Sequence, residues 1–152
     1  MNEIDRKIVD LLAEDSRRSL ADIGERVGLS PSAVNERIRR LTTSGVIRRF
    51  TVEADFPMLG LPVTALVLIG LNYEAGEEAF RIFVSSHPAV AECQHVTGGW
   101  SYLVKIRVAD LTGIEIFLGE LKQRRFLGRS ETMIALSTIT ERAHLPATGS
   151  DT

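Results

Sequence analysis

The sequence predicts an α+β fold, in which a helical N-terminal third precedes a region of mixed strands and helices. Three observations lead to this prediction. Apolar residues recur at helical spacing up to about residue 43, whereas from residue 63 they alternate or run continuously, as they do in strands. The segment between the two regions, EADFPMLGLP, contains two prolines and a glycine. We therefore predict four parts: a first domain (1–52), a linker (53–62), a second domain (63–142) and a flexible tail (143–152).

Composition favours a soluble, folded protein. The 152 residues are 44% hydrophobic and carry a formal net charge of −2. No apolar run approaches the about 18–20 residues of a membrane span, and no leader is evident, so we expect a cytoplasmic protein that does not contact membranes. The single cysteine, Cys93, excludes an internal disulfide framework and indicates a buried, inert thiol.

Three helices are expected in the first domain. The first spans residues 2–15, with Asn2 as its cap and Ile4, Ile8, Leu11 and Leu12 at core spacing.

The second helix follows Ser19, an N-cap with Asp22 three residues later, and ends at Gly28. The third follows the N-cap Ser30, with Pro31 at its first position, and ends near Gly45.

The third helix has one apolar stripe and one polar face. Val34, Ile38 and Leu41 lie at i, i+4 and i+7 and predict its buried side. The opposite side is rich in asparagine, serine and arginine. Two short helices joined by a tight turn, with such an outer face on the second, are typical of a helix-turn-helix.

Charge is distributed as a nucleic-acid-binding protein requires. Residues 1–52 carry ten Lys/Arg and eight Asp/Glu, whereas residues 53–152 carry eight and twelve. Five arginines and only one acid, Glu36, lie between residues 30 and 50. A local basic patch on a neutral-to-acidic body favours binding to the DNA backbone.

A wing is predicted after the third helix. The segment from Val46 to Val52 is apolar and β-branched around Arg48 and Arg49, which predicts a β segment and makes the domain a winged helix-turn-helix. Both arginines would then lie near phosphates that flank the groove. The alternative is that they are ordinary surface residues.

The start of the third helix is expected to meet base edges, because this is how the second helix of a helix-turn-helix docks. Asn35 can pair with adenine, and Glu36 can accept a hydrogen bond from cytosine N4. Equally, Glu36 can form an i,i+4 pair with Arg40. The predicted DNA-contacting residues are Ser30, Ser32, Ala33, Asn35, Glu36, Arg37, Arg39, Arg40, Arg48 and Arg49.

The second domain is predicted to have the order β-α-β-β-α-β, a split-βαβ or ferredoxin-like unit. The expected elements are a strand at 63–71, a helix at 77–86, a strand at 90–97, a turn at 98–101, a strand at 102–108, a helix at 111–122 and a strand at 132–139.

Two helices cover only one face of a four-stranded sheet. The first strand (63–71) and the last (132–139) are nevertheless apolar on both faces. The second face is therefore expected to meet another protein surface, and the same face of a second copy is the simplest partner. We predict a two-fold homodimer.

Three runs of the sequence match a known protein family: GLSPSAVNERIRRL with GVI behind it, LGLPV, and HVTGGWSYLVKIRV. From Ile4 to about Glu141 the chain resembles the leucine-responsive regulatory protein/AsnC (Lrp/AsnC, feast/famine) family of prokaryotic transcription regulators. The resemblance implies a DNA-binding winged helix joined to a βαββαβ, RAM-type effector domain. It also implies a sequence-specific regulator whose partners are double-stranded DNA, a second copy in a homodimer that assembles further, commonly to octamers, and an amino-acid effector bound between effector domains.

By the same resemblance, the turn at residues 98–101 builds the effector pocket. Glycines there let backbone N–H groups approach a carboxylate. Many relatives carry acids at the positions of Gly99 and near Ser101, and this chain has neither, so an α-amino group lacks its expected partner. Trp100 either closes the pocket or packs at the dimer seam, and Tyr102 supplies either a hydroxyl or core packing. The implied effector-binding residues are Gly98, Gly99, Trp100, Ser101 and Tyr102, with Met133, Ile134 and Ala135 from the other subunit.

Two other functions are compatible with parts of the sequence. An architectural protein that wraps DNA without effector control is slightly favoured by the missing acids. A siroheme-decarboxylase-like enzyme would need basic and imidazole groups around a large cavity, and only Lys105, Arg107 and His95 are candidates. The cationic third helix argues against that enzyme. The sequence shows no metal-ligand spacing, nucleophile with a histidine base, or phosphate loop, so we expect no metal, no cofactor and no enzymatic activity.

Overall fold

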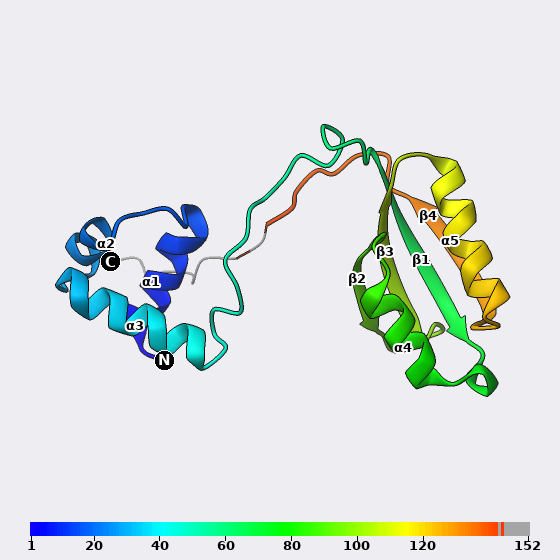
Figure 1. Cartoon of the computed structure of the whole chain (residues 1–152), viewed down its shortest axis with the longest axis horizontal. Helices are drawn as coiled ribbons and strands as arrows, with labels where there is room; N and C mark the ends of the chain where they lie inside the picture. Colours follow the sequence, from blue (N-terminus) through cyan, green and yellow to red (C-terminus); the bar gives the residue numbers. More distant parts are fainter. Residues whose placement is uncertain (143, 145–152) are drawn as a thin grey trace. The chain divides into compact units, whose positions relative to one another are not determined.

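The computed structural model describes residues 1–142 and 144, which form two compact units (Figure 1). The first comprises residues 1–53 together with the described residues from Ile139 onward, and the second comprises residues 54–138. The predicted linker therefore belongs almost wholly to the second unit. The predicted tail at 143–152 lies outside the described residues except for His144, whose Nε2 contacts Oδ1 of Asp10. No helix in the described part of the chain is long and apolar enough to cross a bilayer.

The first unit is built from three capped helices. They are α1 (Glu3–Glu14), α2 (Leu20–Val27) and α3 (Pro31–Thr43). The predicted caps Asn2, Ser19 and Ser30 each accept a hydrogen bond from the backbone N–H three residues later, at 3.0, 3.0 and 3.2 Å. Local sequence signals therefore define where each helix begins.

The helices pack around the apolar positions that the sequence predicted. Ile8, Ile23 and Val34 are fully buried, one from each helix. Ion pairs of two arginines also hold the three helices together. Arg18 pairs with Glu14 and Asp22 at 2.8 and 3.0 Å, and Arg37 of α3 pairs with Asp5 of α1 at 2.8 Å.

The predicted wing is wrong. Residues 46–52 form turns and irregular backbone, and Val52 is 82% exposed. A β segment needs a neighbouring strand to pair its N–H and C=O groups, and the described part of the first unit is otherwise helical. Only Ile47 packs against the helical core, and its N–H donates to the Leu41 carbonyl at 3.0 Å. Within residues 1–53 the unit is thus a helix-turn-helix without a wing.

The second unit confirms the predicted βαββαβ order. Its elements are β1 (Val63–Leu71), the 3₁₀ helix η1 (Tyr73–Ala75), α4 (Glu77–Ser86), β2 (Val90–His95), β3 (Tyr102–Val108), α5 (Leu111–Gln123) and β4 (Leu127–Ile134). The strands form one antiparallel sheet in the order β2-β3-β1-β4.

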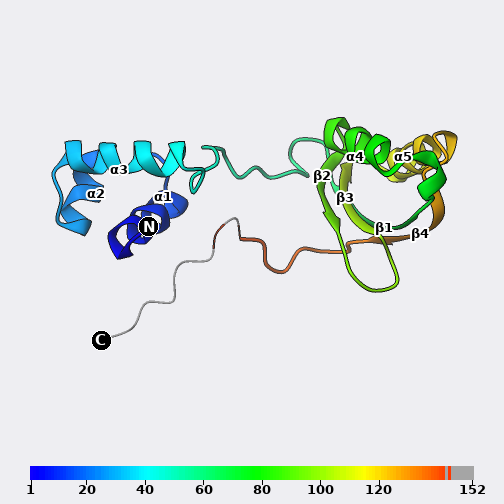
Figure 2. The same ribbon diagram turned by 90° about the horizontal axis from the view of Figure 1, so that it is seen from below.

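Both α4 and α5 lie on the same side of this sheet (Figure 2). Between them and the sheet lies a core that includes the fully buried Phe80, Val67 and Ile106. We call the side opposite the helices the open face. It carries Thr64, Leu66, Leu68, Glu92, Leu103, Lys105, Arg107, Arg129, Glu131 and Met133.

The predicted position of the last strand, 132–139, is wrong by five residues. The apolar run TMIALSTI suggested that position, but β4 begins directly after the buried Phe126 and pairs with β1 from Leu71↔Leu127 to Ala65↔Ile134. Its polar middle, Gly-Arg-Ser-Glu, is tolerated because β4 is an edge strand with one exposed side. Leu136, predicted to be in the strand, lies beyond it and is 99% exposed.

The Asp5–Arg37 pair predicts acid sensitivity of the first unit. The hydrogen bond from Arg37 lowers the pKa of Asp5 below its ordinary value of 3.8. A carboxyl with a lowered folded-state pKa contributes stability above its unfolded pKa, and this contribution is lost as the pH falls through the folded pKa. We expect Asp5→Asn to lower the urea midpoint of the helical signal at neutral pH and to flatten its fall below about pH 4.

The matched control is Glu3→Gln, which removes an exposed acid from the same helical turn. An Asp5→Asn variant whose midpoint falls with acid as steeply as that of the unmodified protein would contradict the role of the pair.

Candidate nucleic-acid interface and ligand loop

The turn between α2 and α3 depends on two glycines. Gly28 ends α2 in the left-handed conformation, at φ 72°. Gly24 lies directly under the turn, where an added Cβ would stand 2.4 Å from the carbonyl oxygen of Leu29. The Leu29 N–H also donates to the Gly24 carbonyl at 2.9 Å. Gly24 therefore fixes the close approach of the two helices, a role that the sequence analysis missed although a glycine inside a helical pattern was a usable signal.

The outer side of α3 presents the residues expected to contact DNA. Ser30, Ser32, Asn35, Glu36, Arg39 and Arg40 are all exposed, and Ala33 is half-buried. The opposite side is anchored in the core by Val34 and Leu41. The predicted division of α3 into a buried stripe and a free polar face is confirmed. The contacts of these exposed α3 residues with bases and phosphates stay predictions.

Glu36 pairs with Arg39, whereas the sequence suggested Arg40. The guanidinium of Arg39 donates two hydrogen bonds to the carboxylate, at 2.8 and 3.1 Å. These hydrogen bonds from Arg39 are the main reason that the pKa of Glu36 is lowered. Both side chains are more than half exposed, so the pair is weakly held and can open when another charge competes.

The other predicted arginines differ in their surroundings. Arg37 is turned toward α1 by its pair with Asp5, and its side chain is only 21% exposed, so we assign it to holding α3 rather than to DNA. Arg48 and Arg49 are exposed, but they lie on the irregular segment after α3 and not on a wing.

The turn between β2 and β3 forms the second candidate site. Its closure rests on the Val96 N–H, which donates to the Ser101 carbonyl at 3.0 Å, and on the Ser101 N–H, which donates to Ile69 at 2.8 Å. Gly98 adopts a positive φ of 96°. Gly98 and Gly99 are exposed, and Trp100 is half-buried.

Arg129 of β4 reaches this loop, which the sequence analysis did not foresee. Its guanidinium lies 3.9 Å from the centre of the Trp100 ring, and its Nη2 donates to the Gly99 carbonyl. The side chain passes over Gly70 of β1, where an added Cβ would meet the Cγ of Arg129 at 2.8 Å. The misplaced last strand hid this residue, because position 129 was expected to precede the strand.

Tyr102 is a core residue. Its ring is 3% exposed and stacks on His95 at 4.7 Å. Its hydroxyl donates to Glu77 at 2.6 Å and accepts from Arg81 at 2.7 Å, so it faces α4. Burial, followed by the bond to Glu77, raises the pKa of Tyr102. Of the two roles considered for Tyr102, the structure shows the packing one.

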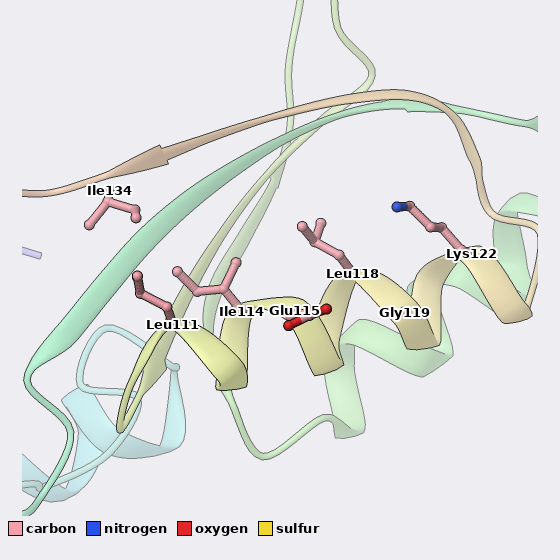
Figure 3. Close-up of a pocket in the computed structure, with 7 residues that line it drawn as sticks. All are labelled: Leu111, Ile114, Glu115, Leu118, Gly119, Lys122 and Ile134. Atoms are coloured by element: carbon pink, nitrogen blue, oxygen red, sulfur yellow. The ribbon is translucent and has the colours of Figure 1, made fainter.

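One chain does not bring the two halves of the expected effector pocket together. The loop adjoins the Ile69 end of β1, whereas Met133 and Ile134 pair with residues near its beginning. Met133 belongs to the open face, and Ile134 lies on the helical side in an apolar groove of about 410 Å³. Figure 3 shows this groove. It is lined by Leu111, Ile114, Glu115, Leu118, Gly119, Lys122 and Ile134. Met133, Ile134 and Ala135 could meet the loop only from another subunit, as the resemblance implied.

The groups considered for an enzymatic site do not gather. His95 lies on the helical side of the sheet, whereas Lys105 and Arg107 lie on the open face. Arg107 stacks on Phe56 at 3.9 Å. Within the described residues, no group of His, Cys, Asp and Glu side chains is arranged to hold a metal ion. Cys93 is half-buried, and burial raises the pKa of its thiol.

A helix-turn-helix with a free polar face, joined to a βαββαβ domain with its own candidate ligand loop, defines a DNA-binding regulator with a ligand-binding domain. Comparison with protein families agrees. Residues 1–42 match the AsnC-type helix-turn-helix domain, and residues 64–145 match the Lrp/AsnC ligand binding domain. The chain belongs to the Lrp/AsnC family of transcriptional regulators.

Named relatives extend over nearly the whole chain. The chain is 33% identical over 120 residues to the transcriptional regulator LrpC of Bacillus subtilis, and the match covers 79% of this chain and 83% of LrpC. The LrpC structure superimposes with a TM-score of 0.83 at 30% identity, over 93% of this chain and 99% of that one. A Neisseria meningitidis transcriptional regulator, solved as a complex with L-Met, gives a TM-score of 0.89 at 25% identity over 96% of both chains.

Gly24 yields a prediction about the turn. Gly24→Ala should destabilise the first unit by about 1–3 kcal/mol, because the new methyl group overlaps the Leu29 carbonyl. Alanine favours a helix more than glycine does, so helix propensity alone predicts the opposite sign. Urea unfolding followed by circular dichroism measures the change.

Gly119→Ala in α5 is the matched control, because an added Cβ there meets nothing within 4 Å. It should be neutral or slightly stabilising. Equal effects of the two substitutions would remove the special role given to Gly24.

Proposed function

We propose that this chain regulates transcription as a homo-oligomer that reads specific double-stranded DNA sequences with α3. The free outer face of α3 is the observation that carries the proposal. Ser32, Ala33 and Asn35 lie toward its N-terminal end, the part that meets base edges in helix-turn-helix proteins. Cations follow at Arg39 and Arg40, with Arg48 and Arg49 beyond the helix, as expected for phosphate contacts.

The salt dependence of binding tests the phosphate contacts. Replacing Arg39 and Arg40 together with alanine should weaken binding to all duplexes and reduce the slope of log K against log salt by about 1–2, because fewer counterions are released. Fluorescence anisotropy with a labelled duplex at several salt concentrations measures both effects. Asn35→Ala should instead change which sequences bind best.

The control is Arg124→Ala, which removes an exposed arginine of the second unit that stacks over Phe83. It should leave the slope unchanged. A double Arg39/Arg40 variant with the slope of the unmodified protein would refute the phosphate contacts.

We further propose that the open face pairs with the open face of a second copy. Leu66, Leu68 and Leu103 are half-buried there without a helix to cover them. Acidic and basic side chains share this face, with Glu92 and Lys105 as cross-strand partners, so two copies can match apolar and charged groups. Assembly beyond the dimer, for example to an octamer, belongs to the same proposal by the behaviour of the family.

Leu68→Asp should shift the dimer to monomers, because it places a charge at the centre of the proposed interface while leaving the helical core untouched. Sedimentation velocity measures the shift. Ile116→Asp is the control, since Ile116 is already 58% exposed on α5. A Leu68→Asp protein that remains a dimer would rule out the open face as the interface.

A small molecule at the β2–β3 loop is proposed to modulate DNA binding. The match of residues 64–145 to a ligand binding domain supports a ligand in this domain, and one similar regulator was solved as a complex with L-Met. The competing function is a DNA-wrapping architectural protein without effector control, which the absence of acids at Gly99 and Ser101 favours. Titrating amino acids and related acids while DNA binding and oligomer size are measured separates the two.

No catalytic role is proposed, since the named relatives are transcriptional regulators. Because the proposed partner is chromosomal DNA, we also expect the protein to act in the cytoplasm.

A further inference from the structure

The guanidinium of Arg129 is held in one position by three neighbours. Gly70 leaves room for the aliphatic part of the side chain to cross β1. The Trp100 ring lies 3.9 Å from the guanidinium, and the Gly99 carbonyl accepts one of its N–H groups. An arginine that is fixed before a ligand arrives loses less side-chain entropy on binding than a mobile one.

Among the described residues, this cation has no anionic partner. Arg129 is exposed on the open face and makes no ion pair within the described part of the chain. Residues 98–101 contain no acid. Glu131, the nearest acid along β4 on the same face, pairs across the sheet with Leu68 and lies about 7 Å along the strand. The N–H groups of Arg129 that do not bind Gly99 are suited to a carboxylate, which guanidinium binds in a bidentate way.

The same loop supplies no carboxylate for an ammonium group. The Gly99 carbonyl already accepts from Arg129. The hydroxyl oxygen of Ser101 already accepts from the Leu71 N–H at 3.1 Å and lies 3.4 Å from the Tyr73 hydroxyl, which donates to it. A ligand ammonium would lose water without gaining an anionic partner and would lie near the positive charge of Arg129.

From this charge arrangement we propose that the β2–β3 loop binds carboxylates that lack an α-ammonium group, such as 2-oxo acids, with Arg129 receiving the carboxylate. The inference rests on the proposed role of this loop as the ligand site. Glycine at position 99 also leaves space beside the guanidinium, because a Cβ added there would lie 3.7 Å from Nη2 of Arg129. The protein would thus distinguish a 2-oxo acid from the amino acid that has the same carbon skeleton.

Trp100 is the only tryptophan in the chain, so its fluorescence reports on this loop directly. The test titrates the full-length protein with matched pairs: pyruvate and alanine, 4-methyl-2-oxopentanoate and leucine, 2-oxoglutarate and glutamate. Isothermal titration calorimetry gives the dissociation constants independently. We expect at least one 2-oxo acid to change the Trp100 emission and to bind at least tenfold more tightly than its amino acid.

Arg129→Gln should weaken that binding at least tenfold, and Arg129→Lys should weaken it less, because the charge remains but the bidentate geometry is lost. Arg124→Gln is the matched control, since it removes another exposed arginine stacked on an aromatic ring and should bind as the unmodified protein does. Circular dichroism and the thermal midpoint establish that each variant is folded. If Arg129→Gln is destabilised, the Arg129→Lys variant and the paired ligands still decide the question.

Three results would overturn the proposal: amino acids that bind as tightly as their 2-oxo acids, no binding of any 2-oxo acid, or unchanged binding after Arg129→Gln. DNA affinity without ligand is measured in parallel on the same proteins. If the unmodified protein binds DNA in a salt-dependent way but binds no 2-oxo acid, this inference alone is refuted. If the unmodified protein does not bind DNA, the proposed function is refuted.

Discussion

The sheet of the second unit has two faces that carry apolar side chains, and the helices of the described residues cover only one of them. The helical side of β1 is buried from Ala65 to Leu71, whereas Leu66 and Leu68 on the other side are only half-buried. Leaving such a surface in water is unfavourable by roughly 25 cal/mol per Å² of apolar area. A second copy that brings the same face removes this surface from water for both chains at once.

Dimerisation through the open face would also serve DNA recognition. One helix-turn-helix contacts a short half-site, and its few base contacts give limited affinity and specificity. A two-fold pair presents two α3 helices to two half-sites on one duplex. The unsatisfied sheet face would therefore determine more than the stability of the second unit, because it would make each protomer half of a DNA-binding dimer.

The ligand loop is structurally connected to that face. Arg129 crosses β1 over Gly70 on the open side of the sheet before it reaches Gly99 and Trp100. A ligand that binds Arg129 would change the charge and packing at the margin of the proposed interface. Linkage then requires that assembly alter the affinity for the ligand by the same factor as the ligand alters assembly.

Features set by neighbouring residues could be predicted, and features set by distant contacts could not. The caps Asn2, Ser19 and Ser30 act within one helical turn, so the sequence alone located them. The βαββαβ order and the two-sided hydrophobicity of β1 follow from periodicity in the same way.

The position of β4 instead depends on its register with β1, more than fifty residues away in the chain. The prediction of a wing was wrong because a wing needs a partner strand, which the described part of the first unit does not supply. The pair of Arg37 with Asp5 and the contact of Gly24 with Leu29 were not predicted, because only the packed helices bring these residues close. Arg129 was missed with the strand that carries it.

If α3 docks on DNA as proposed, Glu36 would let a helix with several arginines still select among sequences. An acid on the DNA-facing side opposes binding to every phosphate backbone, so it lowers nonspecific affinity. In the free protein the charge of Glu36 is neutralised by its exposed pair with Arg39, and the two hydrogen bonds of this pair are easily exchanged. Once Arg39 turns to a phosphate, the carboxylate needs a new donor, and among base edges the cytosine N4 amino group provides one. A site with cytosine there compensates the acid and other sites do not, so the residue that weakens binding overall would be the one that sharpens the choice.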